Sequence, residues 1–210
     1  MTAAWRHLLA RYDDATLRPP ESAARPANLD AADQATLAAL RRWCLANSER
    51  RLAAAVLNGG DHRSASHLAE HLALERDGSW QLAACNGAAA RLRLRALTKL
   101  HDALAALAWR ARQDHDPWDS GHLRSSAAGL QALARFQPRR ATLIVADGTA
   151  PEALRACWAV LRARQQAYAH PVRLLVVGAA NAFAPDAMAA VFTLPSRPQP
   201  SARNSPTQSP

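Results

Sequence analysis

The chain has 210 residues, of which 49% are hydrophobic, and this length and composition are typical of one globular domain with appendages. It contains no apolar run of about 18 residues and its N-terminus lacks a signal-peptide layout, so we expect no membrane span and a cytoplasmic location. The formal net charge is +9 and Lys99 is the only lysine, but the arginines and the few aromatic residues are scattered, which argues against nucleic-acid binding.

The three cysteines predict neither a zinc site nor a redox pair. Cys44, Cys85 and Cys157 are odd in number, far apart and set among apolar neighbours, and the chain has no CxxC motif. We therefore expect buried, reduced thiols.

The first 50 residues predict two helices that precede the main domain. Residues 1–29 contain a short helix candidate at 3–12 and a linker with Pro19, Pro20 and Pro26. Residues 30–50 predict a lead-in helix that runs to about Asn47, with Asp30 as its N-cap. Its apolar residues recur at helical spacing, which favours packing on the following domain. These residues are Leu37, Leu40, Trp43 and Cys44.

Residues 51–194 predict a single α/β domain. Apolar strands without polar alternation, separated by helices of ten or more residues, indicate a mainly parallel sheet covered on both faces. The expected architecture is a three-layer α/β/α sandwich of about four strands, followed by a disordered Pro/Ser-rich tail at 195–210. The expected strands are 52–57, 80–85, 141–147 and 172–177, and the expected helices are 64–76, 88–112, 123–135, 151–168 and, weakly, 185–191. Residues 91–95 alternate, which leaves a strand open there, and residues 114–121 predict a loop.

One strand-loop-helix segment has the outline of a phosphate-binding loop. In LAAAVLNGGDHRSASHLAEHL, from Leu52 to Leu72, the pattern G-x-x-x-x-G-K-[ST] begins at Gly59 and includes Gly60 and Arg63. Its last three positions are Ser64, Ala65 and Ser66. Ser64 replaces the second glycine, and Ala65 replaces the lysine that grips the β- and γ-phosphates.

A second feature falls at the same predicted edge of the sheet. The apolar strand 141–147 ends in Asp147, and ligands of parallel α/β sheets bind beyond the carboxyl ends of the strands. A carboxylate at this place holds magnesium together with a loop hydroxyl, here Ser66. The pair predicts a magnesium site at Ser66 and Asp147.

Simpler interpretations of both features stay open. Asn58-Gly59-Gly60 is also compatible with a plain turn between strand and helix, and Ser64 with a helix N-cap. Asp147-Gly148 is also compatible with an ordinary turn, in which Asp147 or Thr149 caps the next helix.

The remaining polar clusters give weaker signals. His67 and His71 are spaced i and i+4 near His62, but no Glu completes an H-E-x-x-H motif, and solvent-facing histidines are the better interpretation. A polar loop offers candidate acid/base groups, although such residues are common in loops. These candidates are Asp114, His115, Asp116, Asp119 and His122.

With these motifs, residues 51–178 resemble the nucleotide-binding core of the STAND class of bacterial AAA-related P-loop ATPases. The resemblance rests on LAAAVLNGGDHRSASHLAEHLA, FQPRRATLIVADG and HPVRLLVVG. It implies ATP and magnesium as ligands, with Gly59, Gly60, Arg63, Ser64 and Ser66 in the phosphate loop. It also implies that Asp147 is the Walker B acid.

The chain departs from this class at three positions of the expected site. Ala65 and Ser64 replace the loop's lysine and glycine, and Gly148 stands where a second acid activates water in such enzymes. Because electrostatic stabilisation is most of phosphoryl-transfer catalysis, these losses argue against hydrolysis.

We therefore predict a non-catalytic, degenerate P-loop-like binding or regulatory module with weak or no nucleotide binding and an unidentified protein partner. One alternative is a divergent magnesium-dependent ATP-binding protein or ATPase that uses Arg63, Ser66 and Asp147. Another is a truncated copy of a larger signalling ATPase.

Overall fold

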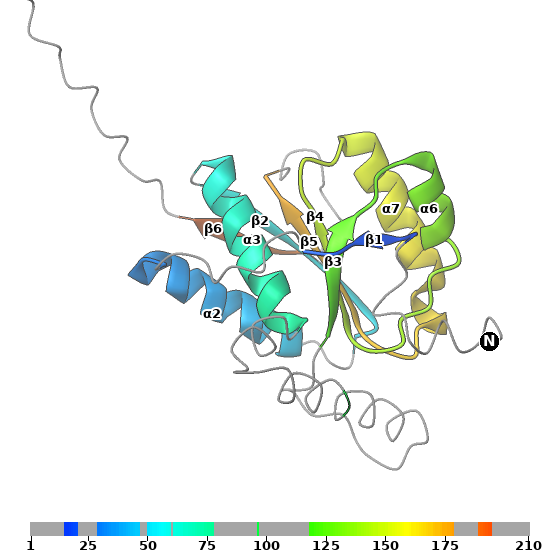
Figure 1. The fold of residues 1–210 in the computed structure, drawn as a ribbon, viewed down its shortest axis with the longest axis horizontal. Coiled ribbons are helices and arrows are strands. Elements are labelled where there is room, and N and C mark those ends of the chain that lie inside the picture. Colours follow the sequence, from blue (N-terminus) through cyan, green and yellow to red (C-terminus); the bar gives the residue numbers. More distant parts are fainter. Residues whose placement is uncertain are drawn as a thin grey trace, which may run out of the picture.

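The chain forms a six-stranded, mostly parallel sheet with helices on both faces (Figure 1). The structure, a computed structural model, describes residues 15–20, 29–46, 50–59, 61–77, 96, 118–178 and 189–194. The strand order is β1-β3-β4-β5-β2-β6, and only β1 is antiparallel to its neighbour. The strands are β1 (Leu17–Arg18), β2 (Leu52–Gly59), β3 (Asp119–Leu123), β4 (Thr142–Ala146), β5 (Val172–Val177) and β6 (Ala189–Leu194).

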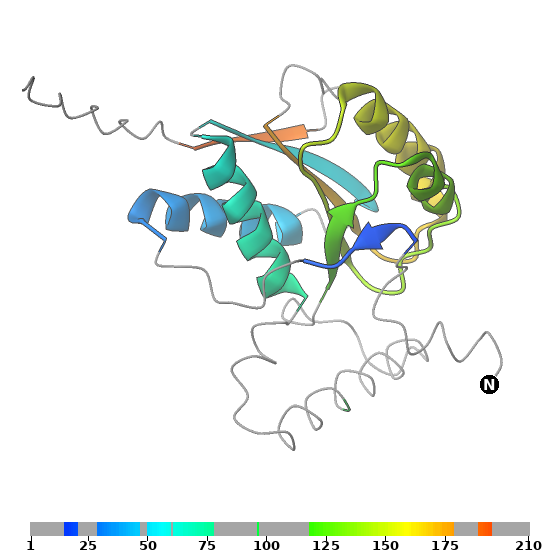
Figure 2. The ribbon, with the colours of Figure 1, turned by 45° about the horizontal axis from the view of Figure 1, so that its top comes forward.

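Four α-helices and one short 3-10 helix lie in the described part of the chain. They divide between the two faces of the sheet, as the rotated view also shows (Figure 2). One face carries α2 (Ala31–Ala46) and α3 (His62–Arg76); the other carries α6 (Ala127–Leu133) and α7 (Pro151–Arg164), which continues into η1 (Gln165–Ala167). The chain is thus a three-layer α/β/α arrangement.

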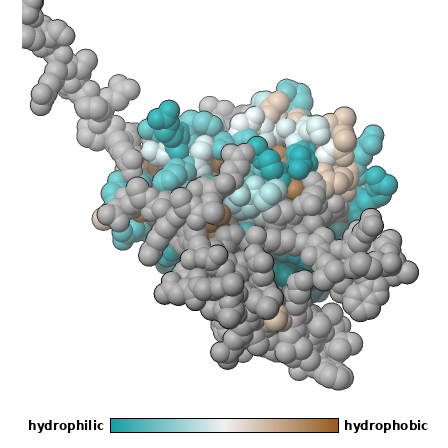
Figure 3. Space-filling model, viewed as in Figure 1, coloured by the Kyte–Doolittle hydropathy of each residue, from teal (hydrophilic) through white to brown (hydrophobic). Residues whose placement is uncertain are grey.

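Two separate apolar clusters hold these layers together, because successive side chains of a strand point to opposite faces. In β2, Ala53 and Leu57 pack toward α2 and α3, whereas Ala54 and Val56 pack toward α7. The many alanines let the helices lie close to the sheet. Val191 is the only large, exposed hydrophobic residue in the described part of the chain. In Figure 3 the coloured residues are mainly teal, with smaller white and brown areas.

The three central strands were predicted correctly from the sequence. β2, β4 and β5 are buried along most of their length and pair in parallel, as their continuous apolar runs indicate. The helix predicted from Asp30 is also confirmed as α2, and the Asp30 carboxylate accepts a hydrogen bond from the Asp33 amide at 2.8 Å. Pro151 begins α7 as expected.

The predicted strand number was wrong, since the described residues alone form six strands rather than about four. β1 has only two residues, which is too short for an apolar strand pattern to be recognised in the sequence. β3, with the sequence DSGHL, was expected to be loop and helix because its Asp, Ser and Gly are poor strand formers. β6 was expected to be partly helical because of its alanines, but it adds to the edge of β2.

Two predicted helix starts were also wrong. α3 begins at His62 rather than Ser64, because the Asp61 side chain is the N-cap and accepts from the Ser64 amide at 2.6 Å. α6 spans only Ala127–Leu133, since Ser126 caps it after β3 has ended. Neither Asp147 nor Thr149 caps α7, whose N-cap position is Ala150.

Several predicted elements lie outside the described residues. They are the helix at 3–12, the linker prolines after Pro20, the strand at 80–85, the tail at 195–210 and the start of the 185–191 helix. Of the helix predicted at 88–112, Ala96 alone is described, and it is helical.

Candidate functional site

A cleft of about 540 Å³, lined mainly by polar and charged residues, lies at the carboxyl ends of β3 and β4 and along the first half of α3. This is the edge at which parallel α/β sheets bind ligands. The volume is in the range of small-molecule sites. The cleft is lined by Arg18, His62, Arg63, Ser66, His67, Glu70, His122, Leu123, Asp147 and Gly148.

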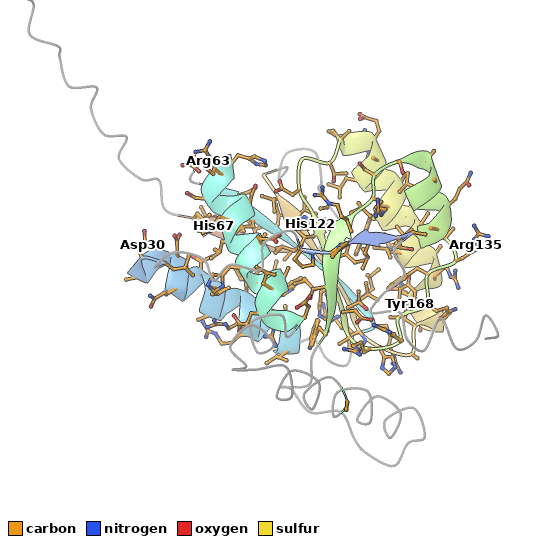
Figure 4. The ribbon with its side chains drawn as sticks, in the orientation of Figure 1. Asp30, Arg63, His67, His122, Arg135 and Tyr168 are labelled. Atoms are coloured by element: carbon orange, nitrogen blue, oxygen red, sulfur yellow. The ribbon has the colours of Figure 1, made fainter. Side chains whose placement is uncertain are left out.

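Helix α3 supplies half of the lining residues because of its helical spacing. His62, Ser66 and Glu70 recur at every fourth residue and so lie on one side of the helix. Arg63 and His67 form the neighbouring row (Figure 4). The opposite side of α3, with Ala65, Leu68 and Leu72, packs into the core and holds the helix in place.

His122 and Glu70 make the shortest polar contact of the cleft. His122 Nε2 is 2.5 Å from Glu70 Oε2, and the two side chains are only 13% and 16% exposed. His122 projects from β3 toward α3 (Figure 4). Partial burial makes this contact stronger than a surface ion pair, so it fixes the distance between α3 and β3.

His62 and Asp147 form a second contact between a histidine and a carboxylate. His62 Nε2 is 3.2 Å from Asp147 Oδ1, but the His62 side chain is 61% exposed, which makes the contact weak. His62 also lies against Gly178, at the end of β5. The His62 ring therefore fills the space between the carboxyl ends of β4 and β5.

Ser66, His62 and Asp147 adjoin one another but do not form a nucleophilic triad. Ser66 Oγ is 3.5 Å from His62 Nε2, the same nitrogen that faces Asp147. A triad histidine uses its two nitrogens for the two partners. Ser66 Oγ also donates to the His62 carbonyl oxygen at 2.9 Å, so its proton is already engaged.

The connection between β2 and α3 is short. β2 continues to Gly59, and α3 begins at His62, so only residues 60 and 61 link them. Gly60, expected in the phosphate loop, lies outside the described residues. Gly59 has a positive φ of 87°, and a Cβ there would lie 2.4 Å from the Leu194 carbonyl oxygen. Close approach of β6 therefore requires this glycine.

The positions expected in the phosphate loop lie mainly within the first turns of α3. Ser64 is in the helix, and its amide donates to Asp61. Ala65, at the lysine position, is 1% exposed and belongs to the core. Arg63, Ser66 and Asp147 do line one cleft, as the sequence predicted for a shared site.

Of the other predicted candidates, His62, His67 and His122 also line this cleft, whereas the rest do not. His71 is buried rather than solvent-facing, and Asp119 pairs with Arg139 at 2.8 Å, at the amino end of β3. Residues 114–116 lie outside the described part. Among the residues described, no three His, Cys, Asp or Glu side chains are arranged to hold a metal ion. The magnesium site at Ser66 and Asp147 stays a prediction.

Sequence reasoning missed Glu70 and Arg18. Glu70 follows Ser66 by four residues, and this spacing was a usable signal for a shared helix face. Arg18 gave no signal, because it enters the cleft only through the pairing of β1 with β3, where Arg18 lies opposite His122.

Comparisons of the chain with protein-family models, with curated proteins and with solved structures found no match. No helix in the described ranges has the length and hydropathy of a membrane span.

Proposed function

We propose that the chain is a non-catalytic α/β binding module of degenerate P-loop type, whose cleft does not grip a magnesium nucleotide as a P-loop ATPase does. The place of the cleft supports this relationship. β2 leads into the loop, β4 leads into Asp147, and β5 lies between them. A loop and an acid at the same carboxyl edge of a parallel sheet are what the sequence motifs predicted.

The observation that carries the proposal is the two-residue link between β2 and α3. A phosphate loop needs enough free backbone to curl its amides around a phosphate. Here His62 to Ser66 are helical, and the Asp61 carboxylate occupies the Ser64 amide. An anion is thus already supplied by the protein where a P-loop would hold the ligand's anion.

The buried Ala65 offers a direct test. In a P-loop, Ala65→Lys would restore the missing charge and strengthen ATP binding. In this structure the new ammonium group would enter the core, so we expect a loss of roughly 2–4 kcal/mol in the free energy of unfolding and no gain in ATP affinity. Urea unfolding and calorimetric titration with Mg-ATP measure both quantities. The matched control is Ala35→Lys, at an exposed position of α2.

A second function, magnesium-dependent nucleotide binding, is favoured by one observation: Arg63, Ser66 and Asp147 line the same cleft. Under this alternative, ATP binds only with magnesium, and Ser66→Ala and Asp147→Asn abolish binding. Ser125→Ala and Glu152→Gln, at exposed positions outside the cleft, would keep it. That binding pattern would overturn the proposal that the cleft does not grip a magnesium nucleotide. Phosphate release from ATP, lost in the same two variants, would overturn the proposal of a non-catalytic module.

A further inference from the structure

The cleft combines two arginines with two carboxylates, each of which lies beside a histidine. Arg18 comes from β1 and Arg63 from α3, and both line the cleft. Glu70 faces His122 at 2.5 Å, and Asp147 faces His62 at 3.2 Å. The Glu70 carboxylate is thus engaged by His122, whereas Asp147 Oδ1 makes only a weak contact with the exposed His62 and has no hydrogen-bond partner among the described residues.

Arg63 is the most available donor of the cleft. It is exposed, and it makes no hydrogen bond or ion pair with any residue that the structure describes. A guanidinium presents five N–H donors in a planar fork that matches the oxygens of a phosphate. Arg18 is held in place by the backbone pairing of β1 with β3, which sets its strand opposite His122.

From this geometry we infer that the cleft binds a phosphate-bearing small molecule without a metal ion, through Arg18 and Arg63. The inference rests on the proposed binding module and names its ligand class. This binding mode differs from that of a P-loop. Side chains from β1 and α3 bind the phosphate, in place of loop amides and a lysine. Ser66 and the cleft histidines add polar contacts around the same ligand.

The N-terminal amides of α3 do not provide this site. The Asp61 carboxylate already accepts the hydrogen bond of the Ser64 amide, and its negative charge offsets the positive end of the helix dipole. A ligand phosphate is therefore directed away from the helix end and toward the two guanidinium groups. Recognition by charge also predicts that binding weakens as salt is raised.

The test is calorimetric titration of the full chain with inorganic pyrophosphate, ADP and adenosine, each in EDTA. We expect pyrophosphate and ADP to bind at low salt and adenosine not to bind. Arg63→Gln and Arg18→Gln should each weaken binding about tenfold or more, since each removes charge-assisted hydrogen bonds. Arg135→Gln, at an exposed position after α6, is the matched control, and circular dichroism checks that each variant is folded.

The outcomes separate this inference from the proposed function. No binding of either phosphate compound at millimolar concentration overturns the inference and leaves the non-catalytic module standing. An equal loss in Arg135→Gln means non-specific attraction and also overturns it. Binding that appears only when magnesium replaces EDTA, and is lost in Asp147→Asn, overturns both. ADP binding without pyrophosphate binding would mean that the base, not the phosphate, is recognised, which overturns the inference alone.

Discussion

Arg173 is a charged residue near the start of the central strand β5, and its side chain is fully buried. Its guanidinium donates to the carbonyl oxygens of Cys44, Arg50 and Val172 at 3.0–3.2 Å. Cys44 lies in the last turn of α2, whose carbonyls need donors, so Arg173 ties α2 to β5. Burial lowers the pKa of Arg173 to about 10, so the group stays charged at neutral pH.

Replacing this arginine tests how much those bonds contribute. Arg173→Met keeps much of the apolar stem and removes every donor, which leaves buried carbonyl groups unpaired. We expect the free energy of unfolding to fall by about 1–3 kcal/mol, measured by urea denaturation. Arg135→Met, at an exposed site, should change little. A variant at Arg173 as stable as the original would show that the cost of burying the charge equals the gain from its bonds.

His71 is a buried histidine on α3, and it gives the protein a sensitivity to acid. Burial is the main cause of the lowered pKa of His71, with a smaller opposing effect from Glu75. The unfolded chain therefore binds a proton more readily than the folded chain. The buried, neutral His71 side chain therefore contributes its full stabilisation of the fold above the ordinary histidine pKa. This stabilisation is lost as the pH falls through the lowered pKa.

Accordingly, His71→Gln should reduce the loss of stability between about pH 8 and about pH 5. The measurement is the free energy of unfolding at several pH values in that window. His67→Gln, one turn away and exposed, is the control; because His67 makes only a minor contribution to the pKa of His71, this variant should change the pH dependence little. An unchanged slope in His71→Gln would assign the acid sensitivity to other groups.

At the scale of elements, the contact between β2 and β6 depends on Gly59. It combines a φ of 87° with close approach to the Leu194 carbonyl oxygen. We expect Gly59→Ala to lower the free energy of unfolding by about 1–3 kcal/mol and to increase amide exchange in β6.

Gly148→Ala separates the two causes. Gly148 also has a positive φ, of 58°, but no atom lies within 4 Å of the position that a Cβ would take. This variant therefore carries the backbone strain without the clash. Equal losses in the two variants, with β6 exchange unchanged, would show that the approach of β6 does not require glycine.

Element prediction succeeded where one local rule was sufficient. The runs at β2, β4 and β5 are apolar on both faces, so any parallel sheet would bury them. β3 and β1 have no such pattern. Their residues form strands because neighbouring backbone groups are available, with Leu17 opposite Leu123 and Asp119 opposite Thr142. Such strands are set by tertiary pairing rather than by propensity.

At the scale of the molecule, two cores on opposite faces share one sheet. Cys44 is a residue of α2 and packs into the core on one face of the sheet. Cys157 is a residue of α7 and packs into the core on the other face. Both are free thiols. Burial raises the pKa of Cys44 to about 11 and that of Cys157 to about 12, so neither forms a thiolate readily while the protein is folded.

If the two cores unfold together, Cys44 and Cys157 should be alkylated at about pH 8 with the same dependence on urea. Peptide mapping by mass spectrometry after a short alkylation pulse identifies each thiol separately. Labelling of one thiol at much lower urea would show that the two faces open independently. Above the ordinary thiol pKa the raised values predict lower stability, because only the unfolded chain then releases the protons.

The candidate site also combines residues that local sequence patterns predict with residues that only tertiary pairing brings together. Arg63, Ser66 and Asp147 were predicted together because each follows or adjoins the carboxyl end of an apolar strand, and they do line one cleft. Three further residues of the cleft come from β1, α3 and β3: Arg18, Glu70 and His122. No local sequence pattern indicates that these three elements lie together.

The sequence by itself determined the central parallel strands and the helices beside them, since apolar periodicity and capping residues act within a few positions. It also indicated a phosphate-loop pattern in which Ala65 takes the lysine position. Only the tertiary structure decided how that segment folds. The Asp61 cap starts α3 at His62, Ala65 faces the core, and Gly59 accommodates β6. These outcomes depend on contacts between residues far apart in the chain, which a local pattern does not contain.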